Sequence, residues 1–251
     1  MVGSGGVDSR RTEIVSLTEG VQIPDCIDKL SDYPNDVYYG AGGALPDAGY
    51  LPHVCGSSYS PYNECWQYWP EEDSWTKTST IPREVAYAAS AYHPGWGIIM
   101  SGGCCFFDEV TITKDGEVFH DLAATLLYTS SDHCIAAINA NMQFTTGLCD
   151  GKNETTLYYK DRLPEMYILP DMPTGRDSMG CGLVMNGSGS AEVVVVGGYD
   201  YSYLNTVEIF NIEENTWRTG TSNTSNISSE PIHADFFLIL SCSQEPLPDC
   251  I

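Results

Sequence analysis

Short apolar runs recur along the chain, and several of them end at glycine. The clearest run, Val193–Val196, closes at a glycine pair and indicates a buried strand because it is short and β-branched. The segment Thr206–Ile212 then alternates apolar and polar positions, which is the pattern of a half-buried strand. A polar turn at Glu213–Asn215 leads to Thr216–Arg218, the start of a further strand. This part of the chain is therefore predicted to form three consecutive strands.

Glycines that follow such runs recur at a nearly constant interval. Gly56, Gly103, Gly151 and Gly198 are separated by 47, 48 and 47 residues. In two copies an aromatic residue follows the glycine by 12 positions and a Trp comes 7 positions later. The repeat positions are Gly5, Gly6, Gly56, Tyr68, Trp75, Gly102, Gly103, Gly151, Gly197, Gly198, Phe210 and Trp217. A period of this length is typical of solenoids, propellers and arrays.

A strand rich in small residues precedes each of the four evenly spaced glycines. These strands are expected at Val37–Leu45, Val85–Tyr92, Cys134–Ala140 and Met179–Met185. Small side chains suit the most crowded strand of a sheet, the one nearest a central axis. The repeated unit is therefore predicted to be a four-stranded sheet, and no segment shows a sustained helical period. Such sheets, set radially, bury both faces against their neighbours.

A glycine pair, then Tyr or Phe, then Trp, in units of about 50 residues, resembles the kelch repeat of β-propellers. The resemblance is strong over 191–218, fair over 50–79 and 96–103, and weak over 132–170. It implies an all-β chain, 1–251, that forms one propeller of four-stranded antiparallel blades. The expected blades are 34–80, 81–127, 128–173 and 174–220, with a fifth split between 1–30 and 231–251.

The fifth blade admits two interpretations. Gly5-Gly6 and Thr12–Leu17 align with the glycine pair and third strand of the clearest copy, and Ala234–Leu240 could supply the first strand. Pairing strands from both ends of the chain would close the ring and remove its sheet edges. Alternatively, the sequence is a fragment of a longer chain, because kelch propellers usually have six or seven blades.

The chain is strongly acidic, with 34 Asp and Glu against 11 Lys and Arg and a formal net charge of −23. Such a surface repels nucleic acid and anionic membranes, so neither is an expected partner. It attracts a basic partner or divalent cations, unless it is simply a solvated surface without a special partner. No apolar run approaches the roughly 20 residues of a membrane-spanning helix.

Ten cysteines are an unusually large number for a chain of 251 residues. Cys55 with Cys65, and Cys134 with Cys149, lie in hairpin registers that allow disulfides, and Cys242 with Cys250 could close a C-terminal loop. A vicinal Cys104–Cys105 bond is possible but strained, and neither Cys26 nor Cys181 has an assignable partner. Sequence alone does not fix the connectivity.

An even cysteine count favours an oxidising compartment. Sequons for N-glycosylation at Asn153, Asn186, Asn223 and Asn226 agree with this expectation. Met1–Arg11 lacks an apolar signal core, so an extracellular chain would have lost its true start. The chain is predicted to be extracellular, and an intracellular kelch adaptor is the alternative.

The loops between second and third strands are rich in aromatic residues. These candidate binding residues are Tyr59, Tyr62, Phe106, Phe107, Tyr199, Tyr201 and Tyr203. Exposed aromatics beside polar residues are typical interface anchors, although packing between blades would use them equally well. Carboxylates also lie near the glycines, at Asp8, Asp108, Asp150 and Asp200. They are expected either to form a ring that binds Ca²⁺ or a basic peptide, or to serve only as ordinary turn residues.

The chemistry expected of an enzyme is hard to find. His53, His93, His120, His133 and His233 lie in different repeats, and no pair has metal-ligand spacing. The six arginines are too scattered for the triad of sialidase-type propellers. No catalytic residue, metal or cofactor is predicted. The expected function is binding of a protein partner through the loops, and the alternative is a propeller enzyme of galactose-oxidase-like or carbohydrate-active type.

Overall fold

The structure is a computed structural model of the chain. It describes residues 2–4, 12–16, 25–27, 30–35, 40–45, 51–56, 63–103, 107–147 and 152–220. Of the first three segments, only Thr12 has a described side chain. The described residues form strands and a single turn of 3₁₀ helix, Lys160–Arg162, and none of their helices is long and apolar enough to cross a membrane.

The strands form five antiparallel sheets in chain order. The first sheet has three strands, β1 (Val2–Ser4), β2 (Thr12–Ser16) and β3 (Asp25–Ile27). The second has β4 (Ala41–Leu45), β5 (Leu51–Cys55), β6 (Glu64–Trp69) and β7 (Ser74–Thr80). The third has β8 (Ala89–His93), β9 (Gly97–Ser101), β10 (Glu109–Thr113) and β11 (Phe119–Thr125). The fourth has β12 (Cys134–Asn139), β13 (Met142–Thr146), β14 (Thr155–Tyr159) and β15 (Met166–Leu169). The fifth has β16 (Gly180–Met185), β17 (Ala191–Val196), β18 (Val207–Asn211) and β19 (Thr216–Thr219).

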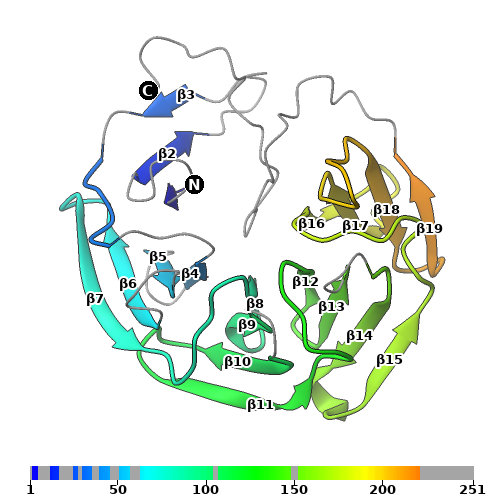
Figure 1. The fold of residues 1–251 in the computed structure, drawn as a ribbon, viewed down its shortest axis with the longest axis horizontal. Coiled ribbons are helices and arrows are strands. Elements are labelled where there is room, and N and C mark those ends of the chain that lie inside the picture. The colour runs from blue at the N-terminus through cyan, green and yellow to red at the C-terminus, as the bar shows by residue number, and fades with distance from the viewer. Residues whose placement is uncertain are drawn as a thin grey trace.

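The sheets are arranged radially around a centre (Figure 1). The first strands of the four-stranded sheets, β4, β8, β12 and β16, lie innermost and contact one another in that order. The last strands, β7, β11, β15 and β19, lie at the rim. This is the propeller-like, all-β arrangement that the glycine period predicts. Strand Ala234–Leu240, expected to complete the first sheet, lies outside the described residues, as do Gly5, Gly6 and Gly151.

The innermost strands require small residues because neighbouring strands lie very close to them. A Cβ atom added to Gly42 in β4 would lie 2.0 Å from the carbonyl oxygen of His53 on β5. The amide of Gly42 also donates a hydrogen bond to Ser90 Oγ on β8, at 2.7 Å. A larger side chain at this position would separate neighbouring strands.

The hydrophobic core lies between successive sheets. Ile98 and Met100 of β9 pack against Leu45 of β4 in one layer, and Phe144 of β13 packs against Phe210 of β18 in another. The rings of Phe144 and Phe210 have centroids 5.3 Å apart. Alternate residues of each strand therefore face one neighbouring sheet or the other.

The aromatic residues of the repeat meet across the outer strands. Tyr68 on β6 pairs with Trp75 on β7, and Phe210 on β18 pairs with Trp217 on β19 in the same register. The ring centroids are 5.1 Å apart in both pairs. The seven-residue spacing in the sequence is thus the length of a hairpin that brings the two rings together.

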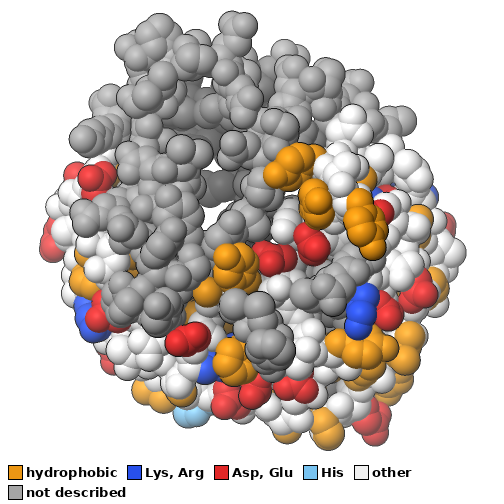
Figure 2. All heavy atoms as spheres, viewed as in Figure 1, with side chains coloured by type: hydrophobic (Ala, Val, Ile, Leu, Met, Phe, Trp, Pro, Cys, Tyr) orange, Lys and Arg blue, Asp and Glu red, His pale blue; other side chains and the backbone are white. Residues whose placement is uncertain are grey.

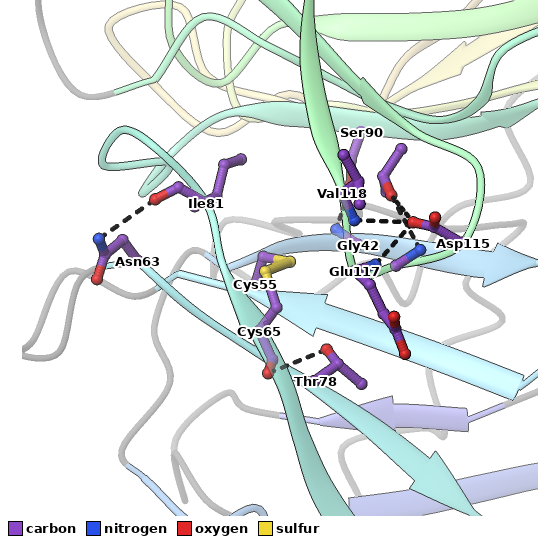
Figure 3. The surroundings of a disulfide bond; sticks show 12 residues. Gly42, Cys55, Asn63, Cys65, Thr78, Ile81, Ser90, Asp115, Glu117 and Val118 are labelled. Carbon is purple, nitrogen blue, oxygen red and sulfur yellow. Dashed lines mark hydrogen bonds between the residues drawn. A yellow bond between two sulfur atoms is a disulfide. The ribbon is translucent and has the colours of Figure 1, made fainter.

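A disulfide joins Cys55 and Cys65, as the hairpin register predicts (Figure 3). The two cysteines face each other on β5 and β6, with Cα atoms 4.1 Å apart. Thr78 donates to the carbonyl oxygen of Cys65, and Asn63 donates to that of Ile81. The ends of the loop at 56–63 are therefore held by a covalent bond and by hydrogen bonds.

The predicted pairing of Cys134 with Cys149 is wrong. Cys134 is bonded to Cys181, with Cα atoms 5.9 Å apart. Cys134 lies on β12 and Cys181 on β16, so the bond joins the innermost strands of two neighbouring sheets. Cys149 lies outside the described residues, as do Cys104, Cys105, Cys242 and Cys250.

Candidate functional site

The loops between second and third strands lie against the segments that join one sheet to the next. Gly103 donates its amide to the carbonyl of Ser130, and Ser130 donates to that of Phe107, at 2.8 and 3.0 Å. In the last sheet, Asp177 and Tyr199 exchange both backbone hydrogen bonds, at 2.9 and 3.1 Å. These loops and connecting segments therefore lie at the same end of the strands, and we call this end of the molecule the loop face.

Three exposed tyrosines of the loop face lie together between β17 and β18, in a segment that we call the tyrosine loop (residues 199–203). The side chains of Tyr199, Tyr201 and Tyr203 are 41%, 95% and 51% exposed. The rings of Tyr199 and Tyr203 meet edge to face, with centroids 5.5 Å apart. Tyr201 has a left-handed backbone, with φ 51°, which presents its side chain at the tip of the loop. Hydrophobic side chains gather over β16–β18 in Figure 2.

Backbone contacts fix the base of the tyrosine loop. Leu204 donates its amide to the carbonyl of Gly198 at 2.9 Å. Gly198 has φ 96°, and a Cβ atom there would lie 2.7 Å from the carbonyl oxygen of Asp177. Glycine is therefore required where the loop begins, because a side chain would push the loop away from its neighbour.

A buried ion pair supports the tyrosine loop from below. The side chains of Arg176 and Glu208 are 0% and 4% exposed, and Arg176 Nη2 lies 2.9 Å from Glu208 Oε1. Arg176 Nη1 donates to the carbonyl oxygen of Gly197 at 2.8 Å, and Thr174 Oγ1 donates to Glu208 at 2.7 Å. The exposed tyrosines thus stand on a rigid, hydrogen-bonded base, which is a property of pre-organised binding sites.

The other predicted loop aromatics do not join the tyrosine loop. Phe107 is half-buried, and the guanidinium of Arg83 lies 5.6 Å from the centre of its ring. Arg83 in turn donates to the carbonyl oxygens of Gly102 and Met100, so Phe107 belongs to the packing around that turn. Tyr59, Tyr62 and Phe106 lie outside the described residues.

Tyr128 is an exposed aromatic residue that the sequence analysis missed. It lies in the segment between β11 and β12, is 42% exposed, and carries Lys152 Nζ 3.7 Å from the centre of its ring. Its one sequence signal is an aromatic side chain followed by the polar run Thr129–Asp132. The loop face therefore carries aromatic side chains in more than one sheet.

The expected ring of carboxylates is only partly described. Asp108 and Asp200 lie in loops of two different sheets, whereas Asp8 and Asp150 fall outside the described residues. Within the described part of the chain, no three His, Cys, Asp or Glu side chains come together as metal ligands.

The histidines with described side chains come from different strands or connections: His53 lies on β5, His93 on β8 and His120 on β11, and His133 directly precedes β12. His53, His93 and His133 are buried at 2%, 0% and 5% exposure, whereas His120 is exposed. Burial lowers the pKa of all three buried imidazoles, to about 4 for His93 and about 3 for His133. His233 lies outside the described residues.

One buried pair has the form of a nucleophile and its base. Ser101 Oγ lies 2.8 Å from His133 Nε2. Both residues are buried, and the cavity that Ser101 lines measures about 20 Å³, room for little more than a water molecule. This pair therefore links the ends of two sheets rather than facing a substrate site.

The two described sequon residues both act in loops. Asn153 Nδ2 donates to the carbonyl oxygen of Met172 at 2.9 Å. Asn186 Oδ1 accepts hydrogen bonds from the amides of Ser188 and Ser190 at the β16–β17 turn. Glycosylation of either residue stays a prediction, and Asn223 and Asn226 lie outside the described residues.

Comparison with known proteins supports the fold. A family model described as the kelch motif matches residues 192–224. A fungal alcohol oxidase of the AA5 family, in complex with copper, matches with a TM-score of 0.61 and 17% identity over 89% of this chain. The structure of YjhT matches with a TM-score of 0.67 and 10% identity, over 85% of this chain and 78% of that one. No curated protein sequence matches significantly.

The chain spans about half the length of the fungal oxidase, 51% of which the match covers. At these identities the likeness concerns the fold alone. The motif match falls on β17–β19, where Phe210 and Trp217 make the ring pair that Tyr68 and Trp75 repeat in an earlier sheet. The chain therefore carries a kelch motif on β17–β19 within a kelch-propeller-like arrangement of four-stranded antiparallel sheets.

Proposed function

We propose that this propeller binds a protein partner through the tyrosine loop and catalyses no reaction. The observation that carries the proposal is Tyr201, 95% exposed at the tip of a loop whose base is fixed by backbone hydrogen bonds. A large, rigid aromatic side chain held away from the core costs little conformational entropy on binding. Tyr199 and Tyr203 flank it and enlarge the surface to the size of an interface anchor.

The proposed location is extracellular. Among the described residues, two disulfides join cysteines of which three, Cys55, Cys65 and Cys134, are almost fully buried. Structural disulfides form and persist in oxidising compartments and are rare in the cytosol. The sequons at Asn153 and Asn186 support the same location.

An enzyme is the alternative, and the fungal alcohol oxidase is the observation that favours it. Copper is bound in that protein. Among the described residues no group of three His, Cys, Asp or Glu assembles, so they bring no such set of copper ligands together. Metal analysis of the purified protein after incubation with copper separates the two functions. Stoichiometric retained copper would favour the oxidase alternative.

A binding screen with paired variants tests the proposal. The wild-type propeller and the Tyr201→Ala/Tyr203→Ala variant are presented to a panel of purified secreted and cell-surface proteins. The matched control is Met185→Ala/Ile168→Ala, which removes side chains that are 64% and 68% exposed on β16 and β15.

We expect a protein whose affinity falls at least about tenfold with the tyrosine variant, since anchor residues contribute 2 kcal/mol or more. The control variant should bind it normally, and both variants should keep the wild-type circular dichroism spectrum. If every protein that binds the wild type binds the tyrosine variant with the same affinity, the tyrosine loop is not the interface.

A further inference from the structure

The chain places its own cations over several of its aromatic rings. Lys152 lies over Tyr128 at 3.7 Å, Arg83 over Phe107 at 5.6 Å, and Arg162 over Tyr159 and Tyr167 at 5.2 and 5.9 Å. An aromatic ring attracts a cation through its quadrupole, and the attraction grows where water is displaced. Two of these pairs, those of Lys152 and Arg83, lie on the loop face.

The tyrosine loop lacks such a cation. Among the residues that the structure describes, no Lys or Arg lies over the rings of Tyr199, Tyr201 or Tyr203. These rings are also among the most exposed large apolar side chains of the described chain. Apart from the edge-to-face contact between Tyr199 and Tyr203, the faces of these rings are therefore available to a cation from outside.

Arg176, which lies beneath the tyrosine loop, cannot supply a cation to these rings. Arg176 is 0% exposed, is paired with Glu208, and donates to the carbonyl oxygen of Gly197. Moving its guanidinium to the surface would leave Glu208 buried without its counter-charge, which is costly. The charge that would suit the tyrosine rings must come from another molecule.

Electrostatics favours a basic molecule. The chain carries a formal net charge of −23. Asp200 lies inside the tyrosine loop. Burial lowers the pKa of Arg176, and the charges of Glu208 and, to a smaller extent, Asp200 oppose that lowering. Asp177 exchanges backbone hydrogen bonds with Tyr199 at the base of the loop. An incoming Lys or Arg thus meets a negative field and aromatic faces at the same place.

Resting on the proposed function, we infer that the tyrosine loop recognises an arginine or lysine side chain on a basic segment of its protein partner. The cation lies against the rings of Tyr201 and Tyr203, and Asp200 supplies the opposite charge. Arginine suits the site best, because its planar guanidinium stacks on aromatic faces and binds carboxylates with two hydrogen bonds. Binding by a single such contact is weak and falls as salt concentration rises.

The test uses a fluorescein-labelled peptide of alternating glycine and arginine and its matched control, in which citrulline replaces every arginine. Citrulline keeps the shape of arginine and removes the charge. Fluorescence anisotropy gives the dissociation constants at low and physiological salt. We expect the arginine peptide to bind at least about tenfold tighter than the citrulline peptide, and this ratio to shrink with salt.

Variants then separate a cation–ring contact from general attraction. Tyr201→Phe and Tyr203→Phe keep the ring and should bind normally, whereas Tyr201→Leu and Tyr203→Leu should each weaken the arginine peptide about fivefold. Asp200→Asn should also weaken it, while Glu214→Gln, which removes an equal charge from the β18–β19 turn, should not. Circular dichroism and urea unfolding establish that each variant folds.

Any one of the following results would overturn the inference. The first is equal affinity for the arginine and citrulline peptides. The second is equal loss with the leucine and phenylalanine variants, or with Asp200→Asn and Glu214→Gln. The third is tighter binding of an oligosaccharide panel that competes with the peptide, which would assign the rings to sugars. The screen could also yield a protein partner that fails to bind the Tyr201→Ala/Tyr203→Ala variant but whose affinity for the wild type does not change with salt concentration. That result would support the proposed function and refute only the inference that the partner is basic.

Discussion

The indole nitrogen of Trp217 donates a hydrogen bond to the carbonyl oxygen of Pro170, at 2.9 Å. Trp217 lies on β19 and Pro170 directly follows β15, so the bond crosses to the preceding sheet. The indole nitrogen of Trp75 on β7 also donates to the preceding sheet, although there the acceptor is the side-chain hydroxyl of Thr12 on β2, at 3.0 Å. The Trp of the repeat therefore packs on the aromatic residue of its own sheet and ties that sheet to the one before.

Replacing Trp217 by Phe should lower the free energy of unfolding by about 1 kcal/mol, because a ring remains and one hydrogen bond is lost. Trp69→Phe is the matched control, since Trp69 is 40% exposed and no hydrogen bond of its indole is described. Urea unfolding measures both. A Trp217→Phe midpoint equal to that of the control would contradict the role of the bond between sheets.

The bond between Cys134 and Cys181 should stabilise the fold more than the bond between Cys55 and Cys65. The first spans 47 residues and the second 10, and closing a longer loop removes more entropy from the unfolded chain. We expect losses of about 4 kcal/mol for Cys134→Ser/Cys181→Ser and about 3 kcal/mol for Cys55→Ser/Cys65→Ser.

Peptide mapping without reductant tests the same pairing directly. A cross-linked peptide that contains Cys134 and Cys181 is expected. A peptide joining Cys134 to Cys149 would restore the pairing that the hairpin register suggested and would refute the bond between β12 and β16.

The wrong pairing of Cys134 with Cys149 shows which features of this fold cannot be predicted from the sequence. Strands within a sheet leave local signals, such as the run Val193–Val196 and the alternation after Thr206, so the order of the strands was predictable. The expected start of β8 at Val85 is too early, because Ala88 donates to the carbonyl of Val85 in a turn and the strand begins at Ala89. Contacts between sheets, such as Cys134 with Cys181, join residues a full repeat apart and leave no local trace.

The candidate site likewise has one part that could be predicted from the sequence and another that could not. Tyr201 could be predicted because an aromatic residue in a polar loop after a glycine pair has no strand to join. Its support could not, because Arg176 and Glu208 belong to different segments and only the packing of the sheet brings them together. Tyr128 was missed because it lies in a connection between sheets, for which the repeat provides no marker.

The protein should lose stability as the pH falls below about 6.5. Burial lowers the pKa of His93 to about 4 and that of His133 to about 3, whereas an unfolded histidine titrates near 6.5. Between these values the unfolded chain binds protons that the folded chain does not, so the free energy of unfolding decreases as the pH falls through this window. Above pH 6.5 these two residues contribute no pH dependence.

Unfolding by urea at several pH values, from 7.5 down to 4, would measure this effect. His93→Gln should flatten the dependence between pH 6.5 and about 4, because one depressed imidazole is removed. His120→Gln, at an exposed position, should leave the slope unchanged. An unaltered slope in His93→Gln would show that His93 titrates normally in the folded protein.

The ion pairs Arg176–Glu208 and Arg218–Glu192 should differ sharply in importance. Arg176 is 0% exposed, whereas the side chain of Arg218 is 52% exposed. Arg176→Met leaves the Glu208 carboxylate buried and should cost about 3 kcal/mol or more. Arg218→Met removes a solvent-screened partner and should cost at most about 1 kcal/mol. Urea unfolding of both variants makes the comparison, and equal losses would contradict it.

The same ion pair should also control the order of the tyrosine loop. Arg176 donates to the carbonyl of Gly197, where the loop begins, so its loss should loosen the loop and speed chymotrypsin cleavage after Tyr201. Restoring a neutral, packed pair with Arg176→Met/Glu208→Leu should recover much of the stability, but not the hydrogen bond to Gly197. Fast cleavage in a double variant that unfolds like the wild type would therefore assign loop order to that bond. Slow cleavage would assign it to packing alone.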